Sequence, residues 1–231
     1  MTDIVAEARR RGITRLCHFT RSVNLAHILA TREIRATDQL EQSAEGYRPT
    51  DDHRLDGHRS HVSCSIEYPN SWYLDRARRR DPNFQDWVVL ALDVELLGSP
   101  GVKLSQHNAS RDRGAGINAG LDAFISLFEA EVLGRERYTR GPAHPDWWPT
   151  DDQAEVLVPA PISLSNVHYI VVKDDEQAEL ELFRLRQRGD ARLSAPPLVV
   201  APTLFDKREL SESVRAGRRP REFPFRQSGT R

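Results

Sequence analysis

The stretch His18-Phe19-Thr20-Arg21-Ser22-Val23-Asn24-Leu25 decides the expected fold, because it joins a short strand to an amphipathic helix with polar side chains at the junction. In a strand the side chains alternate between the two faces, so His18 and Thr20 share one face. Together with Asn24, they are placed to offer donors and acceptors to a ribose or an amide. The alternative is a core histidine bonded to backbone, with Thr20 capping the helix.

A second stretch, Gln153-Ala154-Glu155-Val156-Leu157-Val158, puts one carboxylate at the start of a β-branched strand. A buried charge is costly unless it has partners. We therefore expect Glu155 at a sheet end or in a cleft, acting as an acid, a base or an electrostatic stabiliser. The alternative is an edge-strand charge that discourages aggregation.

The remaining pattern predicts strands and helices without a regular βαβ alternation, which favours an α+β fold. Ser22 is expected to cap the helix that follows it. Residues 36–60 and 134–150 are expected to be long loops. The strands are expected at 15–19, 61–66, 87–94, 154–158 and 167–172, and the helices at 2–11, 22–31, 72–74, 121–128 and 174–188.

Composition bounds the class of protein. The chain has 231 residues, with 33 Lys+Arg against 34 Asp+Glu, and no apolar run approaches the roughly 20 residues that span a bilayer. The first 12 residues are charged and helical in pattern, so we expect no signal peptide. Cys17 and Cys64 are the only cysteines, without a C-x-x-C motif, and the expected location is a reducing cytoplasm.

We expect residues 1–189 to form one domain and residues 190–231 to form a basic, Pro/Arg-rich C-terminal extension that packs weakly or stays disordered. Arginine clusters occur in both parts, and each is either a phosphate contact or a solvated surface. The clusters comprise Arg76, Arg78, Arg79 and Arg80; Arg111, Arg113, Arg135, Arg137 and Arg140; and Arg215, Arg218, Arg219, Arg221, Arg226 and Arg231.

Arg54 lies in a loop that is rich in ionisable groups, residues 51–58. Three histidines occur nearby, His53, His58 and His61, but no helical i, i+4 pair frames them, so no metal site is expected. Trp147 and Trp148 either stack on a base or are buried at the foot of a loop.

Three motifs in register, from about Thr14 to Arg186, resemble the DarT family of DNA ADP-ribosyltransferase toxins. They are His18-Phe19-Thr20 with Asn24-Leu25; Arg54-Leu55-Asp56-Gly57 ahead of residues 61–66 and Tyr68-Pro69-Asn70; and Asp151-Asp152-Gln153-Ala154-Glu155-Val156-Leu157-Val158. Cys17 is a departure, because the family often has an aromatic residue just before the histidine.

The resemblance implies an ADP-ribosyltransferase-like split β-sheet core with flanking helices, NAD as co-substrate and no metal. Residues 134–152 correspond to the substrate-recognition loop, and Asn24 helps to orient the dinucleotide. The implied NAD-binding residues are His18, Phe19, Thr20, Asn24 and Arg54, and the implied catalytic residues are Arg54 and Glu155.

The resemblance also implies that a base in single-stranded DNA is modified, with the choice of thymine or guanine open and RNA not excluded. It implies a toxin of a toxin-antitoxin or phage-defence system, a macrodomain antitoxin partner of the DarG type, and no membrane partner. From the residues alone, two alternatives stay open: a nucleic-acid-binding module, and a restriction-type nuclease that uses Asp151 or Asp152 with Glu155. The nuclease would need a lysine where Leu157 stands.

Overall fold

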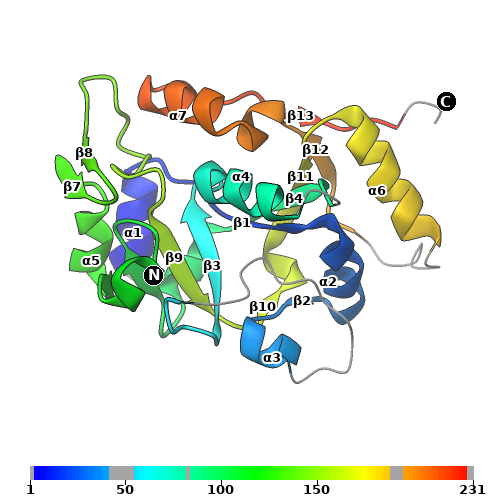
Figure 1. Cartoon of the computed structure of the whole chain (residues 1–231), viewed down its shortest axis with the longest axis horizontal. Helices are drawn as coiled ribbons and strands as arrows, with labels where there is room; N and C mark the ends of the chain where they lie inside the picture. The colour runs from blue at the N-terminus through cyan, green and yellow to red at the C-terminus, as the bar shows by residue number, and fades with distance from the viewer. Residues whose placement is uncertain (1–2, 42–54, 82–83, 188–194, 228–231) are drawn as a thin grey trace.

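The computed structural model describes residues 3–41, 55–81, 84–187 and 195–227 (Figure 1). Nine strands of the described part form one sheet, in the spatial order β13-β12-β11-β4-β1-β3-β9-β5-β6. These strands are β1 (Arg15–Arg21), β3 (His61–Ile66), β4 (Trp87–Asp93), β5 (Lys103–Ser105), β6 (Ile117–Asn118), β9 (Glu155–Pro159), β11 (Val167–Val172), β12 (Leu198–Val200) and β13 (Phe223–Pro224).

Two strand pairs and a set of helices surround this sheet. The pairs are β2 (Glu33–Ile34) with β10 (Ile162–Ser163), and β7 (Glu131–Leu133) with β8 (Arg137–Thr139). The α-helices are α1 (Asp3–Arg10), α2 (Leu25–Thr31), α3 (Thr37–Glu41), α4 (Ser71–Arg80), α5 (Leu121–Ser126), α6 (Asp175–Gln187) and α7 (Lys207–Arg215). The short 3-10 helices are η1 (Ser22–Asn24), η2 (Val94–Gly98), η3 (Arg111–Gly114), η4 (Leu164–Asn166) and η5 (Pro202–Phe205).

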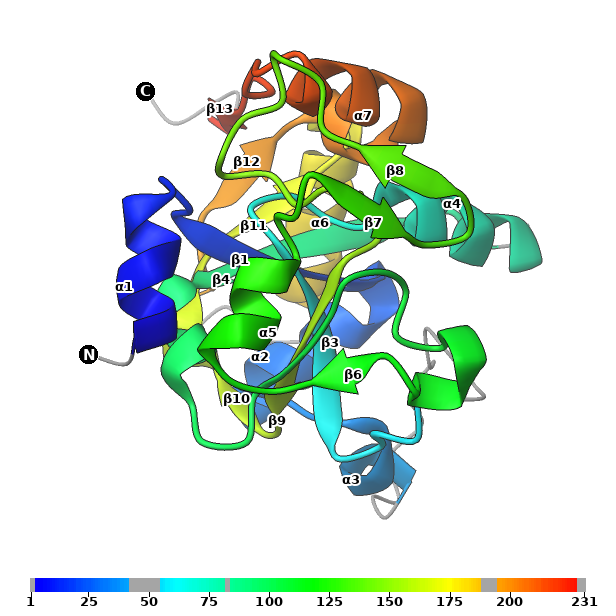
Figure 2. The same ribbon diagram turned by 90° about the vertical axis from the view of Figure 1, so that its left-hand side faces the viewer.

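The sheet is covered on both faces, as the alternating side chains of β4 show. Leu90 and Leu92 belong to a core that α1, α2, α5 and α6 complete. Trp87 and Val89 belong to a second core, which receives side chains from α4, η5 and α7. In Figures 1 and 2, α4 and α7 accordingly lie on the other side of the sheet from α2. A strand buried on both faces reads as a continuous apolar run, and β4 is Trp-Val-Val-Leu-Ala-Leu-Asp.

The sheet splits between β1 and β3. All seven residues of β1 pair with β4, whereas β1 pairs with β3 only at Leu16–Ile66 and Cys17–Ser65. The earlier part of β3, up to Cys64, pairs with β9 instead. In Figure 1, β3 accordingly runs steeply away from β1. The α+β class and the split sheet that the sequence predicted are confirmed.

Most of the expected elements are present. The strands at 61–66 and 167–172 have the expected bounds. The predicted cap at Ser22 is wrong, because this residue lies inside η1, with its amide bonded to Asp86 and its hydroxyl accepting from Arg184. The predicted loop over 36–60 is interrupted by α3; most of the rest of that loop lies outside the described residues.

The weak packing expected of the C-terminal segment is wrong for residues 195–227. Strand β12 adds to the sheet parallel to β11, and α7 contacts α4. The buried Arg15 forms an ion pair with the half-buried Glu222 across this junction. The prediction rested on the average composition of this segment, but its short apolar stretches are enough to make these contacts, because burial needs only a few well-placed side chains. None of the described helices combines the length and apolar character needed to cross a bilayer.

Candidate active site at the split of the sheet

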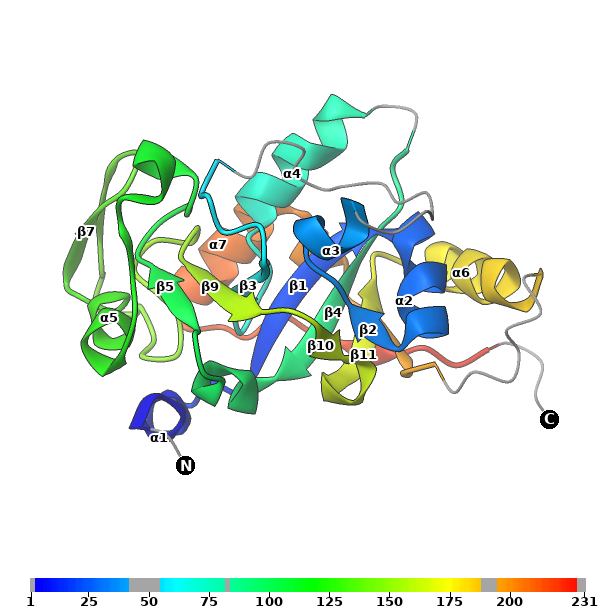
Figure 3. The same ribbon diagram turned by 90° about the horizontal axis from the view of Figure 1, so that it is seen from below.

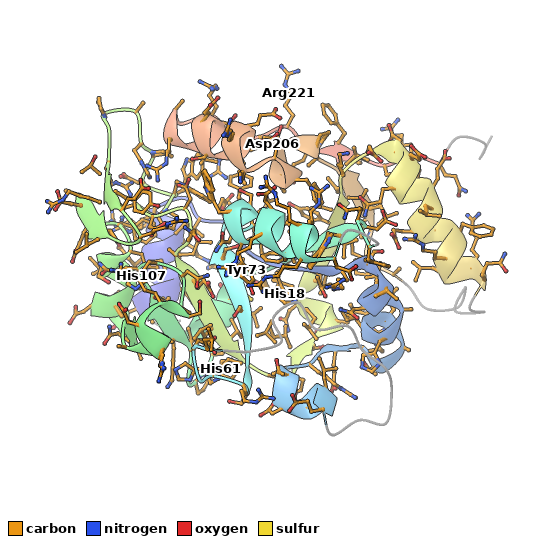
Figure 4. All side chains as sticks on the ribbon, in the orientation of Figure 1. His18, His61, Tyr73, His107, Asp206 and Arg221 are labelled. Atoms are coloured by element: carbon orange, nitrogen blue, oxygen red, sulfur yellow. The ribbon has the colours of Figure 1, made fainter. Side chains whose placement is uncertain are left out.

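A cavity of about 140 Å³ opens where β1 and β3 separate. Residues from β1, α2, β3, the start of α4 and the start of β9 line it. Figure 4 shows His18 and Tyr73, two of the lining residues, close together in the middle of the molecule. The described members of the predicted site all line this cavity, namely His18, Phe19, Thr20, Asn24 and Glu155.

The β1 side of the cavity is built from local spacing. Nδ1 of His18 lies 2.8 Å from the carbonyl oxygen of Ser63 on the diverging part of β3. A carbonyl only accepts, so Nδ1 is the donor, and in the neutral ring Nε2 is the acceptor. Thr20 is buried, and its Oγ1 accepts a hydrogen bond of 3.0 Å from Nδ2 of Asn24, which comes one helical turn later. The hydroxyl thus bonds the amide side chain and caps no helix.

The opposite side carries the carboxylate. Glu155 is the first residue of β9 and is 8% exposed. Its Oε1 accepts from Nδ2 of Asn108 at 2.8 Å and from the amide of Ala109 at 3.3 Å. Asn108 is held in turn, because its Oδ1 accepts from the amide and the hydroxyl of Ser110. Two fixed donors therefore orient the carboxylate at the edge of the cavity.

Sequence reasoning missed Asn108 and Ser110, although both line the cavity. The available signal is the run Asn108-Ala109-Ser110, because an asparagine that accepts from the backbone two residues later makes an Asx turn. That pattern predicts a turn, but it does not predict which strand the turn faces. Only the fold brings this loop to Glu155.

The start of α4 forms an aromatic wall. Asn70 caps this helix, with its Oδ1 accepting from the amide of Tyr73 at 3.0 Å. The Tyr73 ring lies 6.0 Å from that of Phe19, and Phe19 lies 6.0 Å from Trp87 of the second core. A helix cap of this kind fixes the direction of the first turn, so Tyr73 is held against the cavity.

The predicted catalytic residue Arg54 lies outside the described residues, as does His53. Asp56, two residues later, is buried and lines the cavity, and its Oδ1 accepts from the amide of His58 at 3.0 Å. Within the parts of the chain that the structure describes, no group of three or more His, Cys, Asp or Glu side chains is arranged to hold a metal ion.

The structure places the loop tryptophans away from the cavity. Trp148 is 2% exposed, and its Nε1 donates to Asp152 at 2.9 Å. Trp147 is half-buried and lies under the Arg219 guanidinium, 4.4 Å from it. Both rings pack on Tyr68. Stacking of Trp148 on a base is therefore excluded by its burial, and it serves the second core.

Asp151 and Asp152 are not among the described residues that line the cavity. Asp152 is bonded by Trp148, Ser211 and Arg215. Asp151 is 1% exposed, and burial raises the pKa of its carboxyl to about 6. Neither aspartate is placed to share a metal with Glu155, so the geometry does not support the nuclease.

Cys17 lines the cavity at the point where β1 and β3 part. It is 1% exposed, and burial raises the pKa of its thiol to about 12. A thiol with such a pKa stays protonated and behaves as a small apolar group. It is thus a wall residue of the cavity and not a nucleophile.

Comparison with known proteins gives one consistent picture. Residues 17–205 match the DarT family, described as "ssDNA thymidine ADP-ribosyltransferase, DarT". The fold is similar to DarT from Thermus sp. 2.9 in complex with NAD+ (TM-score 0.57, 17% identity, 84% of this chain and 98% of that one) and in complex with ADP-ribosylated ssDNA (TM-score 0.59, 18% identity, 84% and 97%). It is also similar to Thermosipho africanus DarTG in complex with ADP-ribose (TM-score 0.54, 15% identity, 83% of this chain and 51% of that one). No curated protein matches the chain significantly.

The split sheet with its cavity is therefore the fold of the DarT ADP-ribosyltransferases. Because the family match spans most of its length, the chain belongs to the DarT family of ssDNA thymidine ADP-ribosyltransferases. The resemblance that the three sequence motifs carried is confirmed.

Proposed function

We propose that the cavity at the split binds NAD+ and that Glu155 directs transfer of its ADP-ribose to thymine in single-stranded DNA. The observation that carries this proposal is the position of Glu155, which shares the cavity with His18 and Thr20 although 137 positions separate it from His18 in the sequence. Family membership and the NAD+ and ADP-ribosylated ssDNA complexes of the Thermus protein support the substrates.

The lining residues suit a nicotinamide nucleotide. Thr20 and Asn24 offer a hydroxyl and an amide for ribose hydroxyls or the carboxamide. Phe19 and Tyr73 offer flat apolar surface for a ring. Arg35 brings a guanidinium to the same cavity, and this group pairs well with phosphate.

The chemistry assigns Glu155 a defined role. The bond between C1′ of the ribose and the nicotinamide nitrogen breaks, and nicotinamide leaves with the electron pair. Positive charge develops on the ribose, and a carboxylate fixed by Asn108 and Ala109 stabilises it without reorganising. The thymine ring nitrogen that is not bonded to deoxyribose forms the new bond and loses its proton, for which Glu155 is the nearby acceptor. Arg54 is proposed to clamp the phosphates and polarise the base, because a guanidinium is a poor proton acceptor.

Intact-mass analysis of oligonucleotides tests the proposal. The protein is incubated with NAD+ and a single-stranded oligonucleotide that contains one thymidine, beside the same strand without thymidine and the same sequence as duplex. We expect one added ADP-ribosyl group on the first strand alone, since a duplex hides the base edge. Glu155→Gln should reduce the rate at least about 100-fold, as expected for loss of a transition-state charge partner.

The matched control is Glu176→Gln, an exposed glutamate in the first turn of α6. It should transfer ADP-ribose at the wild-type rate. Full activity of a folded Glu155→Gln protein would remove Glu155 from the mechanism. Absence of labelling by the wild-type protein with every oligonucleotide would contradict the substrate assignment.

We further propose that the chain acts as a toxin with a macrodomain partner of the DarG type, as the Thermosipho africanus DarTG suggests. Expression of the wild-type chain should arrest growth, while Glu155→Gln should not. A macrodomain that removes ADP-ribose from the labelled oligonucleotide should restore growth. Arrest by the Glu155→Gln variant would contradict a toxicity based on transfer.

A further inference from the structure

Helix α4 begins at the cavity and presents a distinctive exposed face. Trp72, Arg76, Arg79 and Arg80 follow one another at spacings of four, three and one residues, and all four are exposed. Residues spaced in this way share one side of a helix. The other side, with Leu74 and Ala77, is buried in the second core.

The helix is strongly basic. It contains four arginines and one aspartate, Asp75, which pairs with Lys207 at 2.6 Å and with Arg79 at 3.2 Å. Asp75 is therefore already compensated by cations. The exposed side is left with excess positive charge, and such a face attracts a phosphate backbone.

Trp72 is held in place although 38% of it is exposed. Its Nε1 lies 3.4 Å from Oδ2 of Asp152, and the Lys207 ammonium lies 5.0 Å from its ring centroid. Asp152 is itself fixed by Trp148 and Arg215. An exposed aromatic ring that is oriented in advance loses little entropy when a flat ligand stacks on it.

The position of Trp72 connects it to the site. Asn70 and Tyr73 both line the cavity, and they enclose Ser71 and Trp72 in the chain. Its hydrogen-bond partner Asp152 lies three residues before Glu155. The first turn of α4 therefore borders the cavity, and a strand whose thymine reaches Glu155 has a path over this turn.

We propose that the exposed face of α4 is the track for the single-stranded DNA that flanks the target thymidine, with Trp72 stacking on a neighbouring base. Arg76 and Arg80 contact the phosphates of the nucleotides beyond it. From Trp72 to Arg80 the helix rises by about 12 Å, which is enough for more than one nucleotide. Stacking platforms followed by cationic grooves are a general solution for binding single strands. This inference rests on the proposed transfer to DNA.

The stacking part is tested with Trp72→Ala and Trp72→Phe. In Trp72→Ala the KM for the oligonucleotide should rise about 5- to 150-fold, as for loss of one stacked base, while the Kd for NAD+ without DNA is unchanged. Trp72→Phe keeps a ring and should retain most of the affinity. An abasic site scanned through the flanking positions should weaken wild-type binding at one position and should have no effect there in Trp72→Ala.

The phosphate part is tested by the salt dependence of binding. The logarithm of the binding constant falls linearly with the logarithm of salt concentration, and each lost phosphate contact makes this negative slope shallower by about 0.7 for a single strand. Arg76→Ala and Arg80→Ala should each show this decrease. The matched controls are Phe183→Ala and Arg186→Ala, an exposed ring and an exposed arginine on α6. This helix packs in the first core, on the other face of the sheet from α4, and it lies at the opposite end of the molecule from α5 (Figures 1 and 3). Both controls should bind like the wild type.

Other results would overturn the inference. Unchanged oligonucleotide KM in Trp72→Ala, or the same abasic penalty in wild type and variant, would show that no base stacks there. Loss of NAD+ binding in both Trp72 variants would assign the ring to the architecture of the cavity. If Trp72→Ala does not fold, Trp72→Leu, which keeps apolar bulk without an aromatic ring, replaces it in the KM measurement and in the abasic scan. Failure of the proposed function itself is distinct, since then the wild-type protein labels no oligonucleotide at all.

Discussion

The two sides of β1 differ in how they are used. Toward β4, every residue of β1 has a partner, and the partner residues from Trp87 to Leu92 are all buried. Toward β3, pairing stops at Cys17–Ser65, and the residues after Cys17 on β1 and before Ser65 on β3 line a cavity. One strand thus carries the core on one edge and the site on the other. The cavity thus forms where strand pairing is left incomplete, and this is possible because the other edge of β1 is paired throughout.

Removing a buried side chain from the β1–β4 side should have the largest effect on the free energy of unfolding. Leu90 is fully buried and stands opposite His18 in the β1–β4 register. Leu90→Ala should lower the free energy of unfolding by about 2–5 kcal/mol, through lost burial and a residual cavity. Urea unfolding measures this as a lower midpoint at constant slope. The exposed Val23→Ala serves as control, and a loss below about 1 kcal/mol in Leu90→Ala would mean that the paired side is not the stable part.

The segment that leads into β9 contains a buried carboxyl, Asp151, whose effect on stability depends on pH. Burial raises the pKa of Asp151 to about 6 from 3.8, so between about pH 4 and 6 the folded state binds more protons than the unfolded chain. The free energy of unfolding should therefore fall as pH rises through this window, by up to about 3 kcal/mol. Asp151→Asn should lack this decrease in urea unfolding.

The comparison with Asp151→Asn is needed because a second group acts in the opposite direction. Burial lowers the pKa of His144 to about 4, so its contribution to stability rises with pH up to about the ordinary histidine value. Subtracting the profile of the variant from that of the wild type removes this common part. Parallel profiles for the two proteins would show that the Asp151 carboxyl is already ionised in the folded state.

Removing a hydrogen-bond donor from the Glu155 carboxylate should affect turnover more than the binding of NAD+. Asn108→Ala removes the 2.8 Å donor from Glu155, and we expect kcat for transfer to fall about 10- to 100-fold, or about 2 kcal/mol, with little change in KM for NAD+. In the Glu155→Gln background the same change should cost nothing further. Asn118→Ala, an exposed asparagine of β6, is the control. Additive losses would give Asn108 a role independent of Glu155.

The smallest effect is expected on the β1 side. Thr20→Val keeps the shape of the side chain and removes the acceptor of the 3.0 Å bond from Asn24. KM for NAD+ should rise about 2- to 10-fold, since a neutral hydrogen bond contributes about 1 kcal/mol. Steady-state transfer of ADP-ribose to a saturating oligonucleotide, followed against NAD+ concentration, measures this KM. An unchanged KM would mean that Asn24 is oriented by its other contacts.

Local spacing explains what was predictable. His18, Thr20 and Asn24 lie within one strand and the next turn, so their common face follows from the periods of strand and helix. The same argument predicted β3 and β11 with their bounds and Glu155 at the start of β9. These features depend only on residues that are near one another in the chain, so they can be predicted from the pattern of apolar and polar residues.

Other features needed the folded molecule. Asn108 reaches Glu155 across 47 positions, and composition alone did not place β12 in the sheet. For Trp148 the sequence left base stacking and burial both open, and the structure shows that it is buried, whereas Trp72 is exposed. The spacing of residues within each segment is enough to predict which side chains share a face of a helix or strand. Which of these faces meet could be learned only from the folded chain, because contacts between distant segments depend on the packing of all segments together and not on the spacing within any one of them.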